Sequence, residues 1–135
     1  MTKQDLQTAF GQVTSALMHV EPYRGLNLSE LEWLVVPAIK TGQFLVVNDV
    51  LENDALPPAA VALWAFVNPA VEDKLHAQMA VKAPLFRLEP HDWHSGDQPY
   101  LLDVIAPAEH AIALTQRIHR EAFAGRDYKM WRGGE

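Results

Sequence analysis

The chain of 135 residues contains no cysteine, so it forms neither disulfides nor thiolate metal sites. It also lacks an apolar run of about 18 residues, which argues against a membrane-spanning helix. Residues 1–5 lack the apolar centre of a secretory signal peptide. A chain of this length, 49% hydrophobic and 21% charged, can bury its own core. We therefore expect a single cytoplasmic domain covering residues 1–135.

The net charge of −6 argues against general nucleic-acid binding. Residues 115–132 differ from the rest, because they carry five basic and two acidic side chains, a local charge of +3. Such a segment suits an acidic partner or a phosphate group. Cations late in a helix also interact favourably with the helix dipole, so both interpretations stay open. The basic residues are Arg117, Arg120, Arg126, Lys129 and Arg132.

The hydrophobic pattern alternates between helical and strand-like periods. Pro37 lies inside the second helical segment and should kink or shorten it, and Ser29 opens that segment as a capping box. The predicted helices cover residues 2–20, 31–39, 69–80 and 107–124, and the predicted strands cover residues 44–47, 61–67, 100–105 and 128–131, with a further short strand at 84–88. This order predicts an α/β fold with one central mixed sheet.

Asp103 is the most informative single residue, because it interrupts an otherwise apolar strand. A carboxylate in such a strand is costly to desolvate unless it is paired or hydrogen-bonded. It can also serve chemistry that needs a shifted pKa. The alternative is that Asp103 faces solvent or bonds a local backbone group, and the sequence does not choose between them.

The loop at residues 91–97 holds two histidines and two carboxylates, which are both good metal ligands. Their spacing matches no standard metal motif, and the segment from Ser95 to Asp97 is typical of a tight turn. We therefore predict no metal site. A metal-dependent hydrolase would have to use His91, Asp92, His94 and Asp97. The sequence also lacks the nucleophile elbow, the P-loop and the dinucleotide-binding glycine pattern.

Several strings resemble the toxin-activating lysine acyltransferases, bacterial proteins that transfer a fatty acyl group from acyl carrier protein to internal lysines of RTX protoxins. Residues 36–44 resemble the family's proline-alanine-isoleucine segment and the strand after it, and residues 62–65 resemble a strand that ends near a tryptophan. The most specific match joins residues 92–97, Asp-Trp-His-Ser-Gly-Asp, to residues 102–107, Leu-Asp-Val-Ile-Ala-Pro. The similarity extends from about residue 8 to residue 131.

This resemblance implies a single-domain variant of the GCN5-related N-acetyltransferase (GNAT) fold, a mixed β-sheet with helices on both faces. It implies an acyl donor presented by acyl carrier protein, with no cofactor bound, since the usual pyrophosphate-binding glycine pattern is absent. The basic residues Arg117, Arg120 and Arg126 then become candidates for docking the acidic carrier protein. The acceptor would be an RTX-like polypeptide. The family tends to dimerise, and this sequence neither supports nor contradicts a homodimer.

The resemblance also implies the site residues. Asp103 matches the family's catalytic aspartate, whereas Tyr23 stands where the family has its histidine. A phenol has a pKa of about 10 and is a poor base at neutral pH, so an impaired copy that only binds the acyl group or its carrier is the alternative function. His19 is a candidate substitute base if the connector folds back by one helical turn. The candidate substrate-binding residues are Arg24, Trp93, Ser95 and Gly96.

Overall fold

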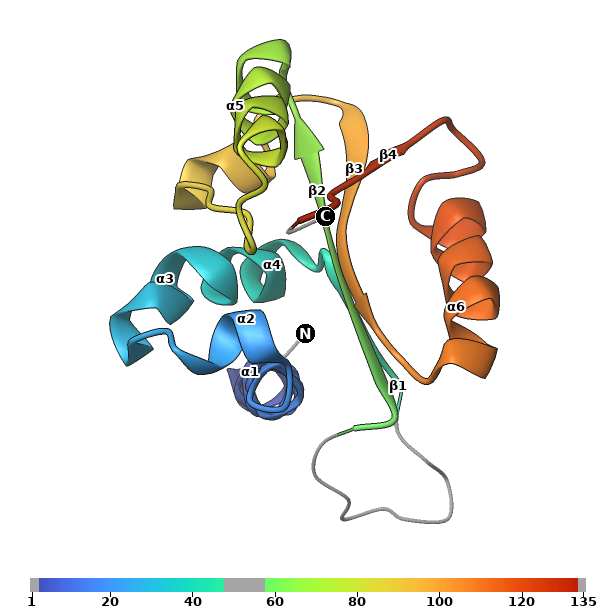
Figure 1. The fold of residues 1–135 in the computed structure, drawn as a ribbon. Coiled ribbons are helices and arrows are strands. Elements are labelled where there is room, and N and C mark those ends of the chain that lie inside the picture. The colour runs from blue at the N-terminus through green and yellow to red at the C-terminus, as the bar shows by residue number, and fades with distance from the viewer. Residues whose placement is uncertain (1–2, 48–57, 134–135) are drawn as a thin grey trace.

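The computed structural model describes residues 3–47 and 58–133, so residue 2, where the first predicted helix begins, and residues 48–57 lie outside the described residues. Within these described residues, four strands form one sheet in the order β1-β2-β3-β4 (Figure 1). The β1–β2 and β2–β3 pairs are antiparallel and the β3–β4 pair is parallel, which confirms the predicted mixed sheet. The strands are β1 (Phe44–Val47), β2 (Ala60–Val67), β3 (Gln98–Ile105) and β4 (Lys129–Met130).

Helices cover both faces of this sheet, as predicted. Figure 1 shows α1 to α5 on one side and α6 alone on the other. Each side has its own buried core, because alternate residues of β2 point to opposite faces. No helix in residues 3–47 or 58–133 has the length and hydropathy needed to cross a bilayer. The helices are α1 (Lys3–Leu17), α2 (Glu21–Arg24), η1 (Leu28–Glu30), α3 (Leu31–Leu34), α4 (Val36–Thr41), α5 (Pro69–Ala80), η2 (Pro90–Trp93) and α6 (Ala108–Glu121).

The predicted helix at residues 31–39 is divided into the two short helices α3 and α4. The break falls at Val35, so that Pro37 lies in the first turn of α4, where its missing N–H costs nothing. The expected capping box at Ser29 does not form, because Ser29 lies inside the 3-10 turn η1. Gly42 ends α4 in the left-handed conformation with φ of +72°, which directs the chain into β1.

The predicted strand at residues 84–88 is wrong. Its apolar residues do alternate, since Phe86 and Leu88 are buried while Arg87 is exposed. The backbone of Arg87 pairs with a side chain, however, and not with a strand. The Gln78 amide donates to the Arg87 carbonyl at 2.9 Å and accepts from the Arg87 N–H at 2.8 Å. The amide thus takes the place of a strand partner.

Candidate active site

Tyr23 and Asp103 meet in the structure although 80 positions separate them in the sequence. Tyr23 lies in the short helix α2 and is only 7% exposed, so its ring packs into the core beneath the sheet. Its hydroxyl donates to the Oδ2 atom of Asp103 at 2.5 Å. The structure therefore brings together the two side chains to which the family resemblance assigns catalysis.

A β-bulge determines which face of the sheet Asp103 points to. Leu63 pairs with Asp103, but the next residue, Trp64, pairs with Leu101, so Leu102 is an additional residue in β3. Strict alternation would place Asp103 on the same face as Leu101, against α6. The bulge instead places Leu102 and Asp103 on the face of the N-terminal helices, where Tyr23 lies.

Burial changes the acidity of both side chains. Burial raises the pKa of Asp103, and the hydrogen bonds from Tyr23 and at the backbone of Val104 offset only part of this increase. Burial, followed by the charge and the hydrogen bond of Asp103, raises the pKa of Tyr23 well above its ordinary value. The phenol therefore stays protonated at neutral pH, and the carboxylate is a stronger base than a solvated aspartate.

The pair lines a cleft of about 460 Å³, which we call the Tyr23–Asp103 cleft. It lies between the second half of β3, the end of β4, the inner face of α6 and the connector before α2. Its volume is within the usual range of small-molecule sites, about 300–1,000 Å³. Its other lining residues include Val20, Pro22, Leu102, Thr115, Trp131 and Arg132. Arg132 was noted in the sequence only as part of the basic segment, and the structure places it at this cleft.

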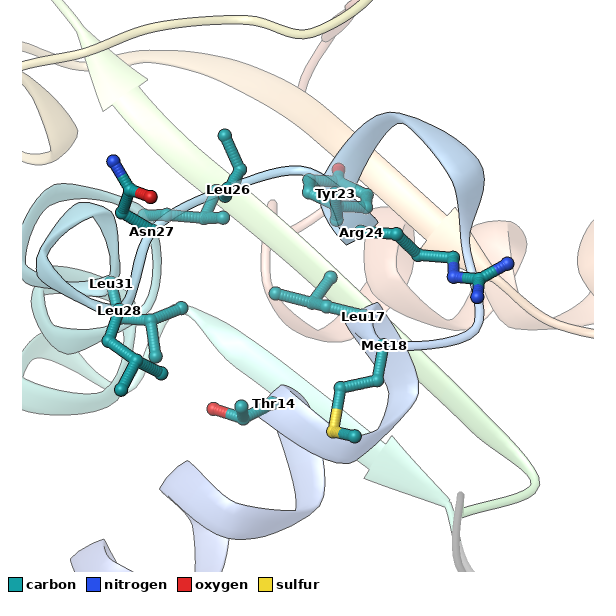
Figure 2. A pocket seen from close by; sticks show the side chains of 10 residues that line it. Thr14, Leu17, Met18, Tyr23, Arg24, Leu26, Asn27, Leu28 and Leu31 are labelled. Atoms are coloured by element: carbon teal, nitrogen blue, oxygen red, sulfur yellow. The ribbon is translucent and has the colours of Figure 1, made fainter.

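A second pocket of about 300 Å³ lies on the opposite side of α2 and also includes Tyr23 (Figure 2). The Tyr23 hydroxyl points away from Leu17 and Thr14 in this view, so the pocket meets the ring of Tyr23 and not its oxygen. We call it the leucine pocket, because its lining is mainly Leu17, Met18, Leu26, Leu28, Leu31 and Leu34. No sequence pattern predicts it, since the helical segments α1, α2, η1 and α3 each contribute one or two residues.

The other two candidates near α2 do not line the Tyr23–Asp103 cleft. His19 is exposed after the end of α1 and lines neither the cleft nor the leucine pocket. Arg24 lies at the rim of the leucine pocket and forms an exposed ion pair with Glu21 at 3.3 Å. Figure 2 shows its side chain extending away from Leu26.

The structural contacts of Trp93, Ser95 and Gly96 explain why these residue types occur at these positions. Trp93 is fully buried, and its indole N–H donates to the Trp33 carbonyl at 2.7 Å. The Ser95 hydroxyl donates to a carbonyl in η2 at 3.0 Å and accepts from the Asn68 N–H at 3.0 Å. A Cβ at Gly96 would lie 2.6 Å from that same Asn68 nitrogen, so only glycine fits. None of the three lines the Tyr23–Asp103 cleft, and a role in substrate binding stays a prediction.

A buried glutamine that sequence reasoning did not single out anchors the same loop. Gln43 donates to the carbonyls of Trp64 and Trp93 at 3.0 and 2.9 Å, and its oxygen lies 2.9 Å from Nδ1 of His94. Its satisfied amide connects β1, β2 and the segment after η2. In the sequence, Gln43 lies between Gly42 and the apolar run at residues 44–47. Its place directly before a predicted apolar strand is the pattern that could have identified it.

The histidines and carboxylates of residues 91–97 are not arranged around a common centre. Asp92 is buried and forms an ion pair with Lys74. Its Oδ1 atom lies 3.4 Å from Nε2 of His91, and its Oδ2 atom accepts from the Glu89 N–H at 2.8 Å. Within residues 3–47 and 58–133, no group of three histidine or carboxylate side chains is close enough to hold a metal ion. The structure offers no support for the hydrolase alternative.

The three arginines proposed for carrier docking lie in two environments. Arg117 and Arg120 are exposed on α6, where Arg117 pairs with Glu121 at 2.9 Å. Arg126 follows the helix and packs over the ring of Phe66 at 5.8 Å, while it donates to the Asp97 carbonyl at 2.9 Å. The two helical arginines are therefore more available to a partner than Arg126.

Comparison with known proteins finds similar chains among lysine acyltransferases. The chain is 27% identical over 123 residues to the lysine-acyltransferase RtxC of Vibrio cholerae serotype O1, covering 91% of this chain and 74% of the relative. It is 28% identical over 116 residues to the protein-lysine myristoyltransferase RtxC of Kingella kingae, covering 86% and 63%. It is 27% identical over 108 residues to the leukotoxin-activating lysine-acyltransferase LktC of a Pasteurella haemolytica-like species, covering 80% and 59%. The chain thus spans less than two thirds of the length of the latter two.

The match to a family model is broader than any of these pairs. The model for the RTX toxin acyltransferase family matches residues 2–134, almost the whole chain. This span includes α2, the bulged strand β3 and every residue of the Tyr23–Asp103 cleft. The protein therefore belongs to the RTX toxin acyltransferase family.

Proposed function

We propose that this protein is an N-acyltransferase that moves a fatty acyl group from acyl carrier protein to internal lysines of an RTX-type protoxin. Family membership supports the reaction class, and the similarity to lysine acyltransferases supports lysine as the acceptor residue. The observation that carries the proposal is the hydrogen bond between Tyr23 and Asp103 inside a cleft large enough for a thioester. A cytoplasmic location and a homodimer remain predictions.

The hydrogen bond gives the reaction a proton path. The lysine nitrogen forms a bond to the thioester carbon, the carbon–sulfur bond breaks, and the amine must lose two protons in all. Tyr23 alone is a poor base, but it already donates its proton to Asp103. As the amine gives a proton to the Tyr23 oxygen, the phenol proton passes to Asp103, whose raised pKa favours accepting it. Asp103 then protonates the departing thiolate, and the other amine proton is released to water.

The charges around the cleft fit a donor carried by a protein. Acyl carrier protein is acidic, and its pantetheine arm is attached through a phosphate. Arg132 lines the cleft, while Arg117 and Arg120 are exposed on α6, the helix that forms one wall of the cleft. A negatively charged carrier docked on α6 would enter the cleft from that side, with its phosphate near Arg132.

The alternative is a protein that binds the acyl group or its carrier without transferring it. The raised pKa of Tyr23 favours this reading, because the phenol cannot accept a proton from lysine unless its own proton leaves at the same time. The two functions share the cleft and differ only in whether the relay through Asp103 operates.

The test is incubation with acyl carrier protein that carries a labelled fatty acyl group, together with a lysine-containing RTX segment. Label on a lysine that disappears in the Asp103→Asn variant supports transfer, with an expected loss of about 10²–10⁴-fold in rate. Saturable binding of the carrier without labelled lysine supports the binding protein. Transfer that is unchanged in both Asp103→Asn and Tyr23→Phe would contradict the proposed relay.

A further inference from the structure

We propose that the leucine pocket holds the alkyl tail of the acyl donor, while the pantetheine arm occupies the Tyr23–Asp103 cleft. This inference rests on the proposed function and adds a second compartment to it. It assigns the selection of acyl chains to residues of α1, η1 and α3, which lie away from the cleft.

The two compartments meet at Tyr23. The connector and α2 form the wall between them: Val20 and Pro22 line the cleft, whereas Met18 and Arg24 line the pocket, and Tyr23 lines both. The hydroxyl of Tyr23 is turned to Asp103 and its ring to the leucine side chains. A thioester whose carbonyl lies beside that hydroxyl would reach the pocket with its alkyl chain along the ring of Tyr23, which is the side chain that the two compartments share.

The lining of the pocket suits an alkyl chain better than a peptide. Six leucine and methionine side chains surround it, and the guanidinium of Arg24 is paired with Glu21 and extends away. A peptide would need hydrogen-bond partners along its whole backbone, and the pocket offers polar side chains only at Thr14, Arg24 and Asn27. An alkyl chain needs only apolar contact.

Two lining residues leave apolar surface uncovered. Met18 is 62% exposed and Leu28 is 86% exposed, although both lie beside buried leucines of the same pocket. Exposed apolar surface next to a concave apolar pocket marks a binding site for an apolar group. A bound chain would cover these two side chains, so that they form the outer wall of the compartment.

The experiment measures binding of S-butyl, S-octyl and S-dodecyl pantetheine by calorimetry. These thioethers lack the thioester carbonyl and cannot transfer an acyl group. Each buried methylene should tighten binding about fourfold until the pocket of 300 Å³ is full. The octyl compound should thus bind up to about 250-fold more tightly than the butyl compound, and the dodecyl compound should gain less per methylene.

The variants are Met18→Asp and Leu28→Asp, whose exposed positions tolerate a charge without unfolding the protein. Each variant should reduce the ratio of the octyl affinity to the butyl affinity by tenfold or more. The matched control is Val81→Asp, which replaces a side chain of similar exposure, 77%, at the end of α5 and should leave this ratio unchanged.

The outcomes separate this inference from the proposed function. The pocket assignment would be overturned if affinity rises equally with chain length in the wild type and in both variants, or if it does not rise with chain length in the wild type. Either result would overturn it even if acyl transfer is observed. A rise in affinity that depends on Leu28 in a protein that transfers no acyl group supports the pocket and rejects the enzyme. An apolar peptide from an RTX segment that competes with the octyl compound would assign the pocket to the acceptor and also overturn the inference.

Discussion

The hydrogen bond between Tyr23 and Asp103 can be measured through stability, independently of catalysis. Tyr23→Phe removes one oxygen atom and keeps the buried ring, so the carboxylate loses its side-chain donor and keeps its hydrogen bond at the backbone of Val104. A hydrogen bond to a charged group contributes about 1.5–3 kcal/mol. We therefore expect the substitution to lower the free energy of unfolding by about 2 kcal/mol at neutral pH.

A double-mutant cycle with Asp103→Asn isolates this interaction. The asparagine oxygen still accepts from Tyr23, but a neutral hydrogen bond contributes only about 0.5–1.5 kcal/mol. Tyr23→Phe should then cost about 1 kcal/mol in the Asn background, which gives a coupling energy of about 1 kcal/mol. Urea denaturation of the four proteins, compared at a common m-value, provides the four free energies. An equal cost in both backgrounds would show that Tyr23 does not bond an ionised carboxylate.

The same cycle has a dependence on pH with a defined sign. Because burial raises the pKa of Asp103 in the folded state, the folded protein holds this proton more tightly than the unfolded chain does. The contribution of Asp103 to stability is fully present below the ordinary carboxyl value of 3.8 and declines as the pH rises through the raised value. The free energy of unfolding of the wild type minus that of Asp103→Asn should thus fall with rising pH and then become constant. A difference that rises with pH contradicts the direction of the pKa shift.

Three further outcomes are expected. Tyr23→His should raise acyl transfer to lysine toward the 10²–10⁴-fold that a general base typically contributes, measured as labelled product; no increase would mean that the base does not limit the rate. Reversing Arg117 and Arg120 to glutamate should slow association with acyl carrier protein by about tenfold or more in stopped-flow measurements, while Lys82→Glu, the control, has little effect. Gly96→Ala should destabilise the protein by about 1–3 kcal/mol in thermal denaturation, because its Cβ would lie 2.6 Å from the backbone nitrogen of the α5 N-cap; an unchanged melting temperature would mean that the contact relaxes.

The sheet and α5 were predictable because their signals are local. The apolar run at residues 61–67 became β2, buried on both faces, and the Asn68 side chain accepts from the Val71 N–H as an N-cap. The region at residues 84–88 was not predictable, because its alternation is that of a strand while its partner is the Gln78 side chain. A pattern in the sequence indicates which side chains are buried, not what their backbone bonds to.

The candidate site was predictable only in part. Asp103 was identified from its apolar surroundings and Tyr23 from the family resemblance, but the face on which Asp103 lies depends on a bulge. That bulge arises from the pairing of β3 with β2, which is a property of two strands and leaves no mark in either one. The leucine pocket is similarly formed by tertiary packing of four segments.

The surplus residue in β3 can be lost without moving the carboxylate to the other face of the sheet. A deletion of the single codon for Leu102 would leave Trp64 opposite Leu101 and Leu63 opposite Asp103, so the strand would pair regularly and the carboxylate would stay on the face of Tyr23. Such an event would cost the protein the buried Leu102 side chain and leave the orientation of the site intact. Among relatives of this protein, a gap of one position here should therefore be compatible with an intact pair.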